Sequence, residues 1–286
     1  MSWDDLVMWP WFYPLAGGLA IALVCSLLSV LVVLRRMAFI GEGVAHAAFG
    51  GAGVALLAGL WLPSLVPPMA RDAVIAAFCV AAAVAIGFLS RRGKLAEDTS
   101  IGIALVAAMA LGFLLLDIRQ QAAESMGGAY TPPLEGLLFG QILFLGPAET
   151  LAAWGLAIVT LALVLMTFKE LTFFAFDEET AGVFGVPTGV FYYGLLILLG
   201  LAIVAATRSV GIILVSALLV LPGASAKLLS ARIGMVTLLS VLIGLAGMAL
   251  GLLLAVTLGY GAGAVIALTY VALLGVCYLV SLLRRA

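Results

Sequence analysis

The stretch PLAGGLAIALVCSLLSVLVVL, residues 14–34, carries no charged side chain. A helix of about 20 residues spans the roughly 30 Å hydrocarbon core of a bilayer, so this run predicts one membrane crossing. It is apolar on all sides, whereas the strands of a membrane barrel alternate apolar and polar residues. The sequence therefore predicts an all-α membrane protein and excludes a barrel.

Similar runs fill the rest of the chain, which is 65% apolar and 9% charged over 286 residues. We expect a single transmembrane domain, residues 1–286, that forms a polytopic helical bundle of eight or nine spans. At Arg208-Ser209, about 40 apolar residues make either two crossings or one crossing and a re-entrant segment. The predicted segments are residues 14–34, 43–62, 70–90, 99–117, 148–168, 188–207, 209–229, 233–258 and 262–283.

The distribution of basic residues predicts the orientation. If the N-terminus lies outside, ten Lys and Arg residues fall in inner loops and three in outer ones, as the positive-inside rule requires. We therefore expect a multi-pass protein of the cell (inner) membrane, surrounded by lipid. The net charge of -1 says nothing about a nucleic-acid partner, but the basic residues occur in ones and twos and form no stripe, so we expect no such partner. The ten inner residues are Arg35, Arg36, Arg91, Arg92, Lys94, Lys169, Lys227, Arg232, Arg284 and Arg285.

One ionisable pair lies inside this apolar sequence. Glu42 precedes the chain's only histidine, His46, by four residues, which places both side chains on one helix face. If the chain turns directly from Arg36 into the second helix, His46 lies about 15 Å into a hydrocarbon core of roughly 30 Å. Ionisable groups are costly at that depth, so the pair predicts a pathway for an ion, a proton or a ligand.

Imidazole nitrogen with carboxylate oxygen suits zinc, manganese or iron, whereas magnesium and calcium prefer oxygen ligands alone. One chain offers two ligands, and two copies related by a two-fold axis would offer four. The small residues Gly50, Gly51 and Gly53 would let two such helices approach closely. Two alternatives stay open: a proton relay through the same groups, and a structural histidine bonded to a neighbouring helix beside a protonated Glu42.

Two loops are long enough to have a function. The inner loop, residues 169–187, predicts a short helix with Asp177 as its N-cap and acidic residues in its first turn. An acidic helix suits the inner lipid leaflet poorly, so we expect it to contact a soluble protein; the alternative is a plain interfacial turn. The outer piece, residues 132–147, is either a re-entrant or interfacial helix or a lid on the bundle.

Four stretches in order resemble the permease subunits of the zinc/manganese/iron ABC importers. Residues 35–47 are similar to that family's Arg-Arg-Met-Ala run followed by Gly-Asp-x-x-x-His-Ala. The other three are a Leu-Phe-Gly-x-Ile-Leu-type stretch, a Phe-Asp-x-x-x-Ala cytoplasmic loop and a Pro-containing helix, at residues 137–143, 176–186 and 209–226. The sequence departs from the family in having Glu42 where an Asp is usual, and Phe49-Gly50-Gly51 where Leu-Pro-Gly is common.

The resemblance implies a homodimeric pore that moves metal by alternating access, with metal in transit at Glu42 and His46 and no permanent cofactor. It also implies cytoplasmic ATP-binding subunits and an extracytoplasmic metal-binding protein. Because the chain lacks a Gly-x-x-x-x-Gly-Lys-Ser/Thr loop, we expect a transport subunit, not an enzyme, with ATP hydrolysed on another polypeptide. The alternatives are a stand-alone proton-coupled carrier and an ABC permease for a metal chelate. The expected ATPase-docking residues are Asp177, Glu178, Glu179, Ala181, Gly182 and Gly185.

Overall fold

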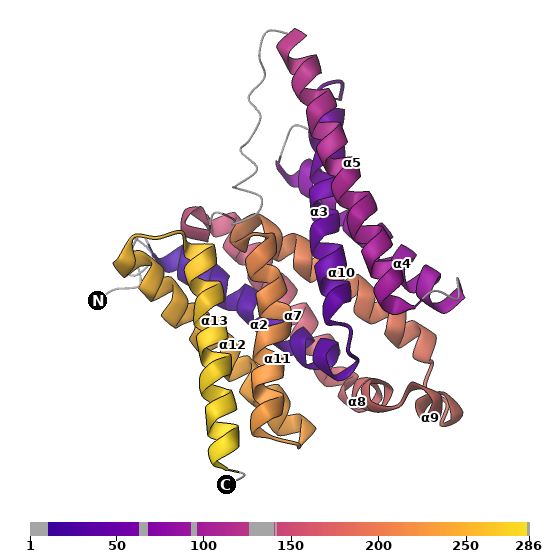
Figure 1. The fold of residues 1–286 in the computed structure, drawn as a ribbon, viewed down its shortest axis with the longest axis vertical. Coiled ribbons are helices and arrows are strands. Elements are labelled where there is room, and N and C mark those ends of the chain that lie inside the picture. Colours follow the sequence, from indigo (N-terminus) through magenta and orange to yellow (C-terminus); the bar gives the residue numbers. More distant parts are fainter. Residues whose placement is uncertain (1–10, 63–67, 93–95, 126–139, 141, 285–286) are drawn as a thin grey trace.

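A computed structural model describes residues 11–62, 68–92, 96–125, 140 and 142–284. Every regular element in these ranges is a helix (Figure 1). Nine of the described helices are long and apolar enough to cross a membrane, which confirms the polytopic all-α prediction. The elements are α2 (Phe12–Leu34), α3 (Ala38–Ala58), α4 (Pro68–Arg92), α5 (Glu97–Ser125), η2 (Ile142–Phe144), α7 (Pro147–Met166), α8 (Phe168–Phe176), α9 (Glu178–Val183), α10 (Thr188–Val210), α11 (Ile212–Leu229), α12 (Ile233–Leu258) and α13 (Ala262–Leu283).

The apolar stretch around Arg208-Ser209 forms two separate helices, each long and apolar enough to cross a membrane, as the two-crossing alternative predicts. The helices part at Gly211, whose φ of 81° lies in the left-handed region that glycine adopts freely. The backbone of Gly140, itself at φ 67°, packs against this point: a Cβ there would lie 2.3 Å from the Gly211 nitrogen. Of the predicted outer piece, residues 132–139 and 141 lie outside the described residues.

The long helices form two groups that share α10 and α11 as neighbours. In the first group α3 packs against α4 and α5, and in the second α2 packs against α7, α11 and α12 while α13 packs on α11 and α12. Figure 1 shows the first group on one side of the molecule and α2 with α11 to α13 on the other. Because α10 and α11 both contact α3, the helix that carries Glu42 and His46 lies where the two groups meet.

The glycines of α3 are used for packing within the chain. A Cβ at Gly50 would lie 2.8 Å from the Ala108 carbonyl oxygen, and one at Gly53 would lie 3.0 Å from the Gly112 carbonyl oxygen, both on α5. Small residues of this kind let backbones approach closely, as expected. The expected partner was wrong, however, because α5 of the same chain occupies the place assigned to a second copy.

The inner loop, residues 169–187, contains two helices where one was expected. The predicted helix is α9, and the Asp177 carboxylate accepts the Thr180 backbone N–H at 3.0 Å, which confirms Asp177 as its N-cap. Its end is marked by Gly185 at φ 83°. The unpredicted helix is α8, which buries Leu171 and Phe174 one turn apart.

Candidate functional site

The turn between α2 and α3 fixes the depth of the candidate metal pair. Only Arg35, Arg36 and Met37 separate the two helices, and Arg36 adopts a left-handed φ of 58° while Met37 is buried. The chain therefore turns directly into α3, as the depth estimate assumed. At about 1.5 Å per residue, His46 lies roughly 12 Å along a helix of about 31 Å. The pair thus sits in the first half of α3, with Glu42 one turn nearer the start of the helix than His46.

Glu42 and His46 touch each other on the partly open face of α3. His46 Nδ1 lies 3.0 Å from the Glu42 carbonyl oxygen and 3.3 Å from Glu42 Oε1. The two side chains are 38% and 21% exposed respectively, whereas Gly43, Val44 and Ala45 between them are buried. Within the described part of the chain, no third His, Cys, Asp or Glu completes a metal-binding group.

This geometry engages one ring nitrogen of His46, Nδ1. A proton on Nδ1 donates to the Glu42 carbonyl oxygen, which leaves the lone pair of Nε2 free for a metal. Among the described residues, the polar partners of His46 both belong to Glu42 on the same helix. A structural histidine was expected to bond to a neighbouring helix, so this observation favours a ligand role.

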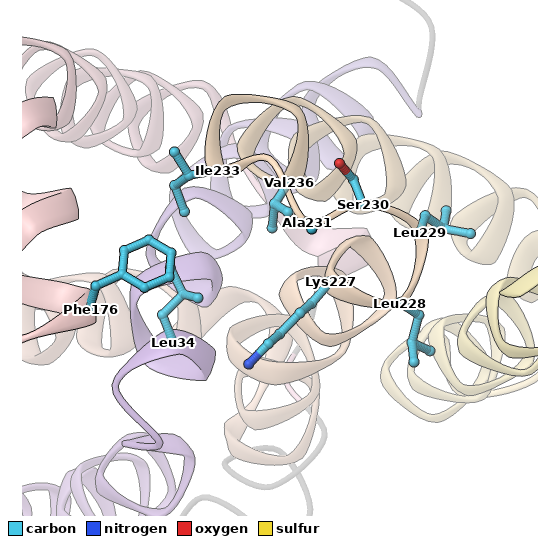
Figure 2. Close-up of a pocket in the computed structure, with 9 residues that line it drawn as sticks. All are labelled: Leu34, Phe176, Lys227, Leu228, Leu229, Ser230, Ala231, Ile233 and Val236. Carbon is cyan, nitrogen blue, oxygen red and sulfur yellow. The ribbon is translucent and has the colours of Figure 1, made fainter.

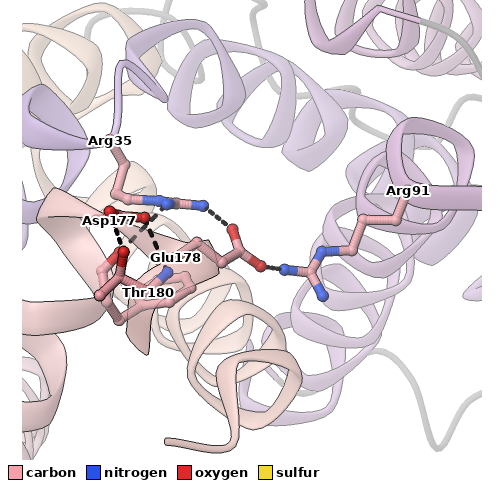
Figure 3. A network of polar contacts seen from close by, with 6 residues as sticks. Arg35, Arg91, Asp177, Glu178 and Thr180 are labelled. Atoms are coloured by element: carbon pink, nitrogen blue, oxygen red, sulfur yellow. Dashed lines mark hydrogen bonds and ion pairs between the residues drawn. The ribbon is translucent and has the colours of Figure 1, made fainter. Parts of the chain in front are cut away.

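A second polar network joins the inner ends of several helices (Figure 3). The Glu178 carboxylate, in the first turn of α9, forms one ion pair with Arg35 and another with Arg91. The Arg35 guanidinium lies 4.2 Å from the centre of the Phe174 ring and donates to the Phe174 carbonyl oxygen at 3.2 Å. The Arg91 guanidinium lies 4.1 Å from the centre of the Tyr192 ring. Glu178 therefore points into the molecule.

These contacts revise the predicted docking surface. Ala181 is fully buried and cannot meet a partner, and Glu178 is held by its two arginines. Asp177 is exposed, but its two oxygens accept the Thr180 N–H and hydroxyl, and these bonds, the hydroxyl's first, hold the pKa of its carboxyl below the usual range. The remaining predicted residues are exposed: Glu179, Gly182 and Gly185.

Two apolar side chains that were not predicted from the sequence are highly exposed at the C-terminal end of α9. Val183 is 86% exposed and Phe184 is 74% exposed, directly after the acidic first turn. The available signal was their position: two large apolar residues at the end of a short helix flanked by glycines. Exposed apolar side chains gathered outside the expected membrane spans are typical of a protein–protein contact.

A pocket of about 370 Å³ adjoins the same region (Figure 2). It lies between the inner ends of α2 and α8 and the turn from α11 to α12, with Leu34, Phe176 and Ile233 among its apolar walls and Lys227 as the charged residue of its lining. Phe176 is the last residue of α8 and immediately precedes Asp177, the N-cap of α9. Glu42 and His46 do not line it.

Comparisons with known proteins cover nearly the whole chain. The model of the ABC 3 transport family matches residues 12–284. The chain is 30% identical over 254 residues to the manganese transport system membrane protein MntC of Halalkalibacterium halodurans, covering 89% of this chain and 81% of that protein. It is 30% identical over 258 residues to the chelated iron transport system membrane protein YfeD of Yersinia pestis, covering 87% and 80%.

A solved structure shares the fold. It is PsaBC from Streptococcus pneumoniae in complex with Fab, which superimposes with a TM-score of 0.79 at 26% sequence identity. The match covers 96% of this chain and 93% of the solved one. The arrangement of helices described above is therefore shared along almost all of both chains.

Proposed function

This chain belongs to the ABC 3 transport family and is a membrane permease of a metal ABC transporter, and we propose that it serves ATP-driven import of divalent zinc, manganese or iron. The observation that carries the proposal is the pair Glu42 and His46, in contact and partly exposed in the first half of α3, with one imidazole nitrogen free. Relatives named for manganese and iron transport support this cargo.

The metal binds transiently between two copies of the chain. One copy contributes the Glu42 carboxylate and the His46 imidazole, and a second copy related by a two-fold axis brings the same two groups, which makes four ligands. Because α5 covers Gly50 and Gly53, the second copy approaches through the face that bears the pair itself. Alternating access then exposes this site first to the outside and later to the cytosol.

A separate ATP-binding subunit docks on the end that the positive-inside rule places in the cytoplasm. Its contact surface consists of the exposed residues of α9 and the adjoining pocket, with Val183 and Phe184 as the apolar anchors and Glu179, Gly182 and Gly185 around them. An extracytoplasmic metal-binding protein delivers the cargo at the opposite end.

The alternative cargo is a metal chelate, since one relative is named for chelated iron transport. A chelate brings its own ligands and needs neither a carboxylate nor an imidazole in the middle of the membrane, where both are costly. The free ion is therefore the better-supported cargo. Membership of an ABC family argues against the stand-alone proton-coupled carrier.

The test is uptake of free manganese, zinc and iron(II) ions by the complete complex in vesicles. We expect His46→Ala and Glu42→Gln each to lower uptake by about a hundredfold, the scale seen when a metal ligand or its immediate support is lost. The ATP-binding subunit should still co-purify with both variants. The matched control is Asp98→Asn, an isosteric change of an exposed carboxylate on α5. Unimpaired uptake in both variants contradicts the site, and uptake of chelated metal alone favours the alternative.

A further inference from the structure

We infer that Glu178 is a positioning residue that connects the docking helix α9 to α3, the helix that bears the metal pair. This inference rests on the proposed function, because it concerns how docking of an ATP-binding subunit reaches Glu42 and His46. It also replaces the expectation that Glu178 itself contacts that subunit.

The two oxygens of the Glu178 carboxylate bind two different parts of the fold (Figure 3). One oxygen pairs with Arg35, which lies three residues before the start of α3 and 143 residues from Glu178 in sequence. The other pairs with Arg91, in the last turn of α4. A single side chain of α9 therefore ties this helix to both the start of α3 and the inner end of α4.

Each arginine is held by contacts that do not involve Glu178. Arg35 lies over the Phe174 ring of α8 and donates to its carbonyl oxygen, and Arg91 lies over the Tyr192 ring of α10. A guanidinium fixed in this way is a rigid fork with a defined direction. A displacement of Glu178 is therefore passed to its neighbours instead of being absorbed by flexible side chains.

The ion pairs are partly shielded from water. The side chains of Arg35, Arg91 and Glu178 are 16%, 29% and 28% exposed, so solvent and salt weaken their attraction less than that of surface pairs. The six residues of α9 are too few to form a stable helix alone. Its first turn is held by the Asp177 cap and by Glu178, while Val183 and Phe184 at its other end face outward.

These contacts form one continuous path from the docking surface to the metal pair. A partner that moves Val183 and Phe184 tilts α9 about its fixed first turn, and Glu178 carries that movement to Arg35. Arg35 belongs to the short turn that leads into α3, and Glu42 lies four residues after Ala38, the first residue of that helix. The path consists of ion pairs and helical segments, the kind of contiguous network that carries coupling between distant sites.

The experiment compares Glu178→Gln, Arg91→Gln and the double variant in the complete complex, with Glu170→Gln as control. Glu170 is an exposed glutamate in the first turn of α8, so it undergoes the same chemical change outside the network. We expect Glu178→Gln to keep the ATP-binding subunit and an ATPase rate within about twofold of wild type, while metal moved per ATP falls about tenfold. The double variant should be no worse than Glu178→Gln, because the ion pair that Arg91→Gln removes is already lost in Glu178→Gln.

A second readout does not depend on the cargo. A fluorescent label at Phe39→Cys, a 63% exposed position in the first turn of α3, should change its emission when ATP binds to the complex. We expect this change in the otherwise unaltered complex and in Glu170→Gln, and its loss in Glu178→Gln. If the wild-type complex carried no metal while the label responded in this pattern, the proposed cargo would fail and the connection through Glu178 would stand.

Other results overturn the inference. Loss of the ATP-binding subunit from Arg91→Gln, in which Glu178 stays paired with Arg35, would make the network part of the docking surface. In Glu178→Gln, the ATPase rate and metal uptake could fall together, with unchanged metal moved per ATP and an unchanged label response. That result would show that Glu178 has only a structural role. Additive effects in the double variant would show that the two residues act separately.

Discussion

Two glutamates, Glu178 and Glu42, differ in the partners that the chain provides for their carboxylates. Both oxygens of Glu178 are paired with arginines from two other parts of the fold, and its side chain is 28% exposed. Glu42 contacts His46, from its own helix, with 3.3 Å between Oε1 and Nδ1, and its side chain is 38% exposed. The chain pairs both oxygens of the first carboxylate with arginines, whereas the second carboxylate is the one that we propose as a metal ligand. A carboxylate that is paired within the chain stabilises the fold. An ionisable group inside a membrane span without such pairing indicates a functional site.

The largest expected effect is on folding stability. Glu178→Ala removes the carboxylate that pairs with two partly buried guanidinium groups, and we expect the free energy of unfolding to fall by about 2 kcal/mol. Glu42→Ala removes a carboxylate that stabilises little, so we expect a change within about 0.5 kcal/mol. Thermal unfolding of the purified permease in detergent measures both. Equal losses in the two variants would mean that Glu42 is structural too.

An intermediate effect separates the two faces of α9. Phe184→Asp places a charge on the outward apolar surface, and we expect the affinity for the ATP-binding subunit to fall about tenfold. Glu178→Gln, on the inward face, should leave that affinity unchanged. Titration of the ATP-binding subunit against the permease in detergent gives both values. Wild-type affinity in Phe184→Asp would move the docking surface away from α9.

The smallest expected effect is on cargo preference. Glu42→Asp shortens the carboxylate arm by one methylene and restores the residue usual in the importers that this sequence resembles. We expect total uptake to stay within about threefold and the relative rates for manganese, zinc and iron to change, because ligand reach and geometry tune selectivity among ions with similar donors. Competition between pairs of ions in vesicles measures this. Uptake as low as in His46→Ala would show that the longer arm is essential.

The long helices were predictable because their signals are local. Each apolar run of about 20 residues can be predicted as a membrane helix by itself, because a helix forms its backbone hydrogen bonds within the segment. The N-cap at Asp177 was equally local, as its partner Thr180 is three residues away. The helix α8 was missed because its apolar residues follow the end of α7 without a proline or glycine to divide them.

The candidate site likewise has features that were predictable from the sequence and features that were not. The pairing of Glu42 with His46 followed from a spacing of four residues, and the structure places their side chains in contact. The expectation that Gly50 and Gly53 pack against a second copy of the helix was wrong, because the sequence does not show which helix covers these glycines. The docking list included Ala181 and Glu178 because they belong to an acidic helix, and only their burial and pairing remove them from its outward face.

The sequence by itself determined that this protein is a bundle of membrane-crossing helices with an acid and an imidazole on one face of the second. Hydrophobic length and helical spacing act over a few turns, so they can be read along the chain. The tertiary structure alone decided that α5 fills the glycine face of α3 and that Glu178 meets Arg35 across 143 residues. Such contacts depend on which surfaces pack together, and that choice is made by the whole bundle at once.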